Sequence, residues 1–152
     1  MALTRAQVEQ ELIDRLGKWL TQAGKDGTTR DGSNADLNGP IGYAIRRMGY
    51  TVANIANVST SDLASVTAAQ LDELLDVAEL RALKNILGNL EQVNFRMGPI
   101  SKDLSDLRAS VEKRIATLEA DINAAYGTNM PDAVFDNAPF YAPTGEDWVG
   151  VL

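Results

Sequence analysis

The sequence predicts an all-α protein: a helical bundle built on a long antiparallel helix pair, followed by an extended C-terminal arm. Three observations predict this class. Apolar residues recur every three or four positions over residues 67–127, which is the period of an amphipathic helix. No apolar run has an obvious partner strand. After residue 127 the period is lost and proline becomes frequent, which excludes a long helix there.

The first helix of the predicted pair covers residues 68–87. Thr67 and Gln70 have the spacing of a capping box, in which each side chain satisfies the backbone amide of the other residue. Acidic residues come early and basic residues late, as the helix dipole favours. Gly88 is expected to end the helix in a left-handed conformation. The apolar face consists of Leu71, Leu74, Leu75, Ala78, Ala82 and Ile86.

The second helix of the pair covers residues 101–126, with Ser101 as its N-cap and Gly127 after its end. A short link to the first helix makes the two antiparallel neighbours. The seven-residue spacing within the apolar stripe resembles a coiled coil, but about three heptads favour one side of a helical core instead. The stripe consists of Leu104, Leu107, Val111, Ile115, Leu118, Ile122 and Ala125.

The link over residues 89–100 contains Val93, Phe95 and Met97 in alternation, which is compatible with either a short edge strand or a packed loop. The packed loop is favoured, because Pro99 follows and no partner strand is evident.

The N-terminal part of the chain predicts a helix over residues 4–23, with a capping box at Thr4 and Gln7 and a stop at Gly24. Trp19 lies on its apolar stripe and is interpreted as a core or interface anchor. A short helix is expected to begin at Pro40.

The loop at residues 25–39 carries Asp26, Asp31, Asn34 and Asp36, which are calcium-ligand residue types. Their spacing does not match an EF-hand, and no glutamate closes the set. The loop is therefore expected to be solvated and flexible.

Composition gives one domain of 152 residues, with a helical part at 1–127 and the arm at 128–152. The chain has no cysteine and no histidine, which excludes disulfides, thiolate zinc sites and nucleophiles activated by histidine. No cofactor and no metal is expected. Residues 1–10 are polar and charged, so no signal peptide is expected, nor any membrane span.

The net charge of −7 argues against binding DNA by neutralising its phosphates. An acidic surface is better suited to DNA that slides past without adhering.

The arm at residues 128–152 has no lysine or arginine, and it supplies four of the acidic residues. Three interpretations are open: a disordered tail, a segment folded onto its own domain, or a segment docked on another chain. The aromatic content favours an arm that is ordered chiefly in an assembly. Its candidate partner-binding residues are the aromatic side chains Phe135, Phe140, Tyr141 and Trp148.

Within residues 71–122, the segments ELLDVAELRALKNILGNL and ISKDLSDLRASVEKRIATLEADI resemble the small helical head-to-tail connector adaptors of tailed bacteriophages. The resemblance implies a homo-oligomeric ring, a dodecamer, bound under the portal protein with the portal's symmetry. It further implies that the C-terminal segment engages the portal, so that the four aromatic residues of the arm would be the anchors.

The same resemblance implies a structural virion protein of the neck, made in the host cytoplasm, which extends the DNA channel and links head to tail. A further neck or tail protein would bind below, and DNA would pass through without specific binding. The alternative is a small helical protein-binding module or chaperone of a bacterial cell, which would form a discrete dimer or heterodimer.

An enzyme is not expected. Paired carboxylates that could cut a glycosidic bond are available at Glu9 with Glu11 and at Asp72 with Glu73. Each pair is expected on an ordinary solvated helix face, which offers no means of tuning a catalytic acid.

Overall fold

The computed structural model describes residues 2–97 and 102–126, and this part of the chain is all-helical, without a β-strand. The predicted all-α class is confirmed. In chain order, the elements are α1 (Arg5–Gln22), η1 (Ala35–Leu37), α2 (Asn38–Arg47), η2 (Thr60–Leu63), η3 (Ala68–Gln70), α3 (Leu71–Met97) and α4 (Lys102–Tyr126), where η denotes a 3-10 helix.

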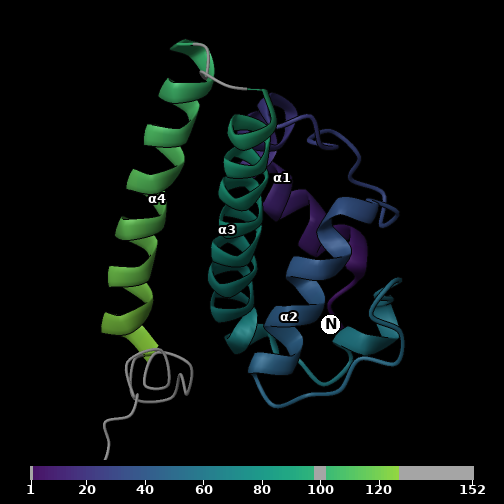
Figure 1. Ribbon diagram of the computed structural model, residues 1–152. Helices are drawn as coiled ribbons and strands as arrows, with labels where there is room; N and C mark the ends of the chain where they lie inside the picture. The colour runs from purple at the N-terminus through teal and green to yellow at the C-terminus, as the bar shows by residue number, and fades with distance from the viewer. Residues whose placement is uncertain (1, 98–101, 127–152) are drawn as a thin grey trace, which may run out of the picture.

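Helix α3 lies at the centre of the molecule (Figure 1). It packs against α1 and α2 on one side and against α4 on the other. One continuous hydrophobic core joins all four α-helices. Its fully buried large side chains are Leu12, Leu16, Leu20, Leu37, Ile41, Ile45, Leu63, Leu74, Leu83 and Ile86.

The start of α1 follows the predicted capping box. The Gln7 backbone N–H donates to Thr4 Oγ1 at 3.2 Å, and the Thr4 N–H donates to Gln7 Oε1 at 2.9 Å. Gly24 follows the helix with a φ of +78°, a conformation that favours glycine. The Lys25 N–H donates to the Leu20 carbonyl at 2.8 Å, which satisfies a carbonyl in the last turn.

Gly88 was expected to end the helix that became α3. Instead, α3 continues through Gly88 to Met97. The prediction of a packed loop at 89–100 is therefore wrong for residues 89–97, which are helical. A glycine inside a helix costs about 1 kcal/mol relative to alanine. Burial of Ile86 before the glycine and Leu90 after it offsets that cost, since each buried aliphatic side chain contributes about 1.5–3 kcal/mol.

Helix α4 presents the predicted apolar stripe to α3. Leu107, Val111, Ile115, Leu118 and Ile122 are at most 9 % exposed, which makes them part of the core. Ala125 was expected to extend the stripe but is exposed, and the next residue, Tyr126, is partly buried against the core instead. The predicted N-cap Ser101 lies outside the described residues.

Helix α2 begins at Asn38 rather than at Pro40, because the 3-10 turn η1 leads directly into it. Pro40 thus occupies the first turn, where its missing N–H is tolerated, and its side chain is buried.

Candidate functional site

The loop at residues 25–39 is organised by its own polar side chains and is partly buried, so the expectation of a fully solvated loop is wrong. Asn34 is 1 % exposed, and its side-chain amide donates to the carbonyls of Asp26 at 3.0 Å and Thr29 at 3.2 Å. Asp36 accepts a hydrogen bond from the Asp26 N–H at 2.8 Å.

Asp26 forms a tight turn with the two threonines that follow it. Its Oδ1 atom accepts from the backbone N–H of Thr28 at 3.0 Å and of Thr29 at 2.9 Å. Hydrogen bonds from Thr29 and then Thr28 stabilise the ionised carboxylate, which lowers the pKa of Asp26 to about 2. The acidic residues of this loop therefore hold backbone amides. Among the described residues, no three of the potential metal-ligating side chains form a cluster.

A buried ion pair anchors this loop to α1. Arg5 is 3 % exposed and Glu9 is fully buried, and Arg5 Nε lies 2.9 Å from Glu9 Oε2. The Glu9 carboxylate also accepts from the backbone N–H groups of Gly32 and Asn34. The loop is thus attached to the first turns of α1 through a carboxylate with no access to water.

The same arginine binds two further segments. Arg5 Nη1 donates to Asn38 Oδ1 at 2.7 Å and to the Val58 carbonyl at 2.8 Å, and Nη2 donates to the Asn34 carbonyl at 2.8 Å. Burial lowers the pKa of Arg5, although Glu9 opposes that effect. With its hydrogen bonds satisfied in this way, the guanidinium joins α1, the loop, α2 and the chain before η2.

A second buried carboxylate, Glu79 of α3, joins three helices. Its side chain is fully buried, and Oε2 lies 3.2 Å from Arg15 Nη1 of α1. On its other side, Oε1 accepts from Arg114 Nε of α4 at 2.8 Å. Arg15 also contacts Asp76 at 2.9 Å. The position of α4 on the body is therefore fixed by charge as well as by the apolar stripe.

Two other contacts hold α4 in place. Trp19 of α1 is partly buried against the core, and its Nε1 donates to Ser110 Oγ of α4 at 3.3 Å. This agrees with the prediction that Trp19 is an anchor. Lys84 of α3 pairs with Glu119 of α4 at 2.9 Å.

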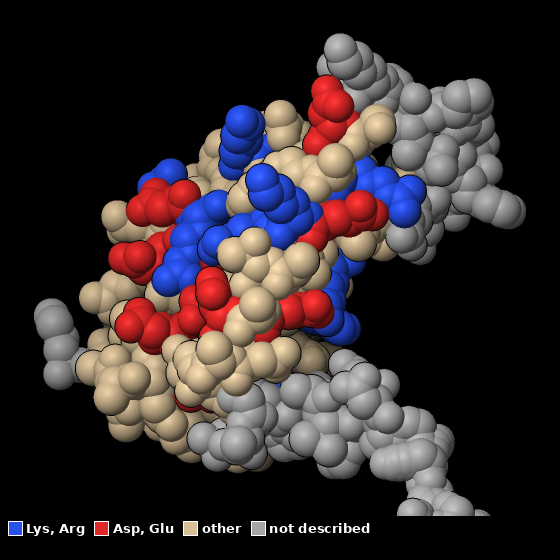
Figure 2. Space-filling model, turned by 90° about the vertical axis from the view of Figure 1, so that its left-hand side faces the viewer, with Lys and Arg blue, Asp and Glu red and all other residues tan. Residues whose placement is uncertain are grey.

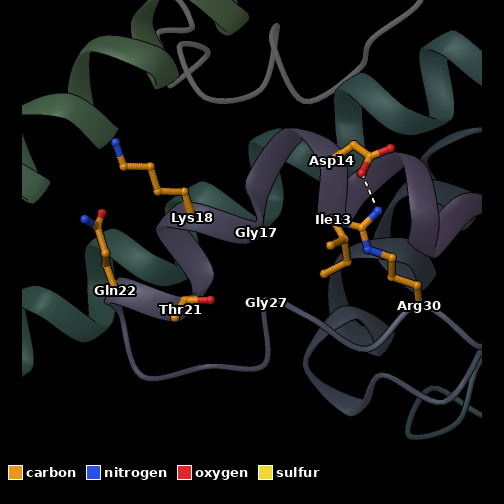
Figure 3. A pocket seen from close by; sticks show the side chains of 8 residues that line it. All are labelled: Ile13, Asp14, Gly17, Lys18, Thr21, Gln22, Gly27 and Arg30. Carbon is orange, nitrogen blue, oxygen red and sulfur yellow. Dashed lines mark hydrogen bonds and ion pairs between the residues drawn. The ribbon is translucent and has the colours of Figure 1, made fainter.

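An open hollow of about 440 Å³ lies between α1 and the 25–39 loop (Figure 3). At its centre the backbones of Gly17 and Gly27 meet so closely that a Cβ atom on Gly27 would lie 2.2 Å from the Gly17 carbonyl oxygen. Asp14 and Arg30 form an ion pair at one side of it. The remaining lining residues are Ile13, Lys18, Thr21 and Gln22. This lining offers no nucleophile beside a base.

The carboxylates considered for catalysis do not form a site. Glu9 is buried and paired with Arg5, contrary to the expected solvated position, whereas Glu11 is exposed. Asp72 is exposed and Glu73 is partly buried in the first turn of α3. The predicted partner-binding residues Phe135, Phe140, Tyr141 and Trp148 all lie outside the described residues.

The outer face of α4 carries interleaved charges of both signs (Figure 2). Arg108 and Glu112 form an ion pair one helical turn apart at 2.9 Å, and both are partly solvent-accessible. Exposed residues of this helix that do not face α3 include Ala109, Glu112, Lys113, Ala116 and Ala120.

A contrasting surface, the basic patch, is formed by Tyr43, Arg46 and Arg47 of α2 and Arg81 of α3. The guanidinium carbon of Arg81 lies 4.7 Å from the centroid of the Tyr43 ring, and that of Arg47 lies 5.7 Å from it. Arg46 and Arg81 are exposed. The sequence has no aspartate or glutamate over 37–61 or over 80–90, the stretches that contribute the patch.

The structural roles of Arg5, Glu9 and Glu79 were not predicted from the sequence. The Arg5–Glu9 spacing of four residues is that of a helical ion pair, and this signal was available. Glu79 lies among apolar residues at 74–86, which indicates burial. Its partners Arg15 and Arg114 lie 64 and 35 residues away in the sequence, so no local pattern identifies them.

No protein family, curated protein or solved structure matches the chain. Among the helices of the described residues, none combines the length and the apolar character that a membrane span requires.

Proposed function

We propose that this chain is a structural virion protein: a head-to-tail connector adaptor that forms a ring under a phage portal, extends the DNA channel and links head to tail. In this proposal the subunit is built on an antiparallel α3–α4 pair, and the segment at 128–152 serves as an extended arm. The protein is made in the host cytoplasm and resides in the neck of the virion.

The observation that carries the proposal is the one-sided packing of α4. Its apolar stripe faces α3, and its contact with α1 is small. The opposite face is solvent-accessible and carries charges of both signs (Figure 2). In a cyclic ring each subunit contacts its neighbour through two different faces. A mixed-charge face supports such a contact, because complementary charges fix its register and exclude wrong partners.

The ion pairs around Glu79 support the same proposal. They tie α4 to α1 and α3 with a fully buried carboxylate, so that the outer face of α4 keeps a fixed position on the subunit. A fixed face is what a closed ring needs, because small changes of angle accumulate over successive subunits.

The arm supplies the contact with the portal in this proposal. It has no basic residue, and its aromatic side chains bury large areas when they enter pockets on a partner. Its anchors are Phe135, Phe140, Tyr141 and Trp148.

The acidic balance suits a channel for DNA. A ring repeats each charge, so a net charge of −7 per subunit produces a negative potential that repels phosphate. DNA then passes without specific binding, while a further neck or tail protein occupies the opposite side of the ring.

The test is the mass of the purified protein, measured by native mass spectrometry alone and with a portal ring. We expect either a homo-oligomeric ring or subunits that add to the portal in its symmetry. A variant with all four arm aromatics changed to alanine should fold normally and fail to add. A discrete dimer that does not bind the portal would instead support the alternative, a protein-binding module or chaperone of a bacterial cell.

A further inference from the structure

The basic patch concentrates positive charge on an otherwise acidic protein. Two guanidinium groups, from Arg47 and Arg81, lie beside the single ring of Tyr43. Arg46 adds a third cation in the last turn of α2. Arg46 and Arg81 are exposed, so the carboxylate of a partner can reach both guanidinium groups. Arginine also binds carboxylates through its planar fork and stacks on aromatic rings. The patch therefore suits a peptide that carries both carboxylates and aromatic rings.

Residues 128–152 have this chemistry. The segment has no lysine or arginine, and its aromatic residues alternate with carboxylates. Fully extended, it would reach roughly 80 Å, which is enough to cross to an adjacent subunit. Its acidic residues are Asp132, Asp136, Glu146 and Asp147.

The exit point of the segment favours a neighbouring copy over the same chain. Helix α4 ends at Tyr126, and α4 and α2 lie on opposite sides of α3 (Figure 1). Burial raises the pKa of Tyr126, and the charges of Asp76, Glu73 and Asp72 raise it further, whereas Arg15, which pairs with Asp76, lowers it. Carboxylates of α3 therefore lie near the end of α4. The charges of Asp72 and Glu73 therefore disfavour an acidic segment on this part of its own subunit.

We propose that the basic patch of one copy binds the carboxylates of the 128–152 segment of a neighbouring copy. The proposal deepens the ring described above and rests on it for the neighbouring copy. It assigns the carboxylates of the segment to the contact between copies, and leaves the aromatic side chains for the portal.

Charge reversal in the full-length protein tests the contact. The patch variant is Arg46→Glu/Arg81→Glu, and the segment variant is Asp132→Lys/Asp136→Lys. Each should weaken association between copies about tenfold, since two exposed ion pairs are lost. An equal mixture of the two should recover association, because the native segment of one then meets the native patch of the other. The matched control Lys18→Glu/Arg30→Glu makes the same change of charge on the α1 side and should have no effect.

Association is measured by sedimentation equilibrium, alone and with portal rings present. Circular dichroism confirms that each variant is folded. The proposal would be overturned if mixing the two variants did not restore the association that each has lost. It would also be overturned if copies of the native chain did not associate either alone or with portal rings.

A second measurement uses the absence of cysteine from the chain. Copies carrying Asn85→Cys, one turn beyond Arg81, are mixed with copies carrying Ala133→Cys. Oxidation should give disulfide-linked dimers of the two kinds, and a lack of them at ring-forming concentration would contradict the contact.

The two proposals fail in different ways. Loss of portal binding by the native chain, with a salt-sensitive contact between copies intact, would overturn only the connector function. Portal binding by all variants, with contacts between copies unaffected by charge reversal, would overturn only the patch.

Discussion

Arg114 of α4 contacts a single oxygen atom of Glu79 on α3, with Nε at 2.8 Å and Nη2 at 2.7 Å from Oε1. Because the Glu79 side chain is fully buried, these contacts replace water that the carboxylate has lost. The opposite oxygen is held by Arg15 of α1.

Replacing Glu79 by alanine should destabilise the protein by about 3 kcal/mol, because two arginines lose their shared counter-charge. Breaking a buried ion pair usually costs about 3–5 kcal/mol. We expect the lower end of that range here, since Arg15 and Arg114 are 29 and 35 % exposed and water can reach them. Urea unfolding measures the change. Glu112→Ala, in an exposed pair with Arg108, is the control and should cost under about 1 kcal/mol. Equal effects of the two substitutions would contradict the role given to Glu79.

Replacing Arg5 by methionine should cost about 3–5 kcal/mol, because Glu9 is left as an uncompensated buried charge. The double variant Arg5→Met/Glu9→Leu should recover part of that loss, since the buried charge is then gone. A double-mutant cycle built on urea unfolding gives the coupling. Additive single effects would show that the pair does not interact as described. The exposed pair of Arg30 with Asp14 provides the matched control cycle.

Stability should fall on acidification between about pH 4 and pH 2, partly through Asp26. Its pKa is lowered in the folded protein from 3.8 to about 2, so the folded state favours the ionised form. The stabilisation is complete above the unfolded pKa and is lost as pH falls through the folded one.

The variant Asp26→Asn should flatten this pH dependence, which thermal unfolding at several pH values would measure. Hydrogen bonds donated by Ser33 lower the pKa of Asp31, and those donated by Ala53 and Ser59 lower the pKa of Asp62. Some dependence of stability on pH should therefore remain in the variant. An unchanged slope in the variant would contradict the contribution of Asp26.

Replacing Gly27 by alanine should destabilise the protein by about 1–3 kcal/mol. The new Cβ would lie 2.2 Å from the Gly17 carbonyl oxygen and 2.4 Å from Thr21 Oγ1, so the loop must move off α1. Gly39→Ala is the control, because apart from the adjacent residues and the backbone of α2 itself no atom lies within 4 Å of its Cβ position. Thermal unfolding compares the two variants, and equal midpoints would rule out the close approach.

Replacing Gly88 by alanine should stabilise the protein by about 0.5–1 kcal/mol, because alanine lowers the entropy of the unfolded chain and fits a helix interior. Apart from the adjacent residues and the backbone of the helix itself, no described atom lies within 4 Å of the new Cβ. If Gly88 instead ended the helix in a left-handed conformation, alanine would be strained and the unfolding temperature would fall. This substitution therefore tests the course of α3 directly.

The features that the sequence predicted correctly are local ones. The capping box at Thr4 and the buried stripe from Leu107 to Ile122 depend on residues three or four positions apart. Gly88 was misread because its local preference for a helix end is outweighed by burial on both sides of it. Glu9 and Asn34 were misread because their burial depends on a loop that folds back across α1, which no local pattern encodes.

The contact between Trp19 and Ser110 gives the protein an internal optical reporter. The chain has two tryptophans, and Trp19 is the one within the described residues, where its indole spans the seam between α1 and α4. Separation of α4 from the body would expose more of that partly buried ring to water and shift its fluorescence emission to longer wavelength. In a Trp148→Phe background, the emission spectrum would follow the seating of this helix in solution, during assembly and without any added dye.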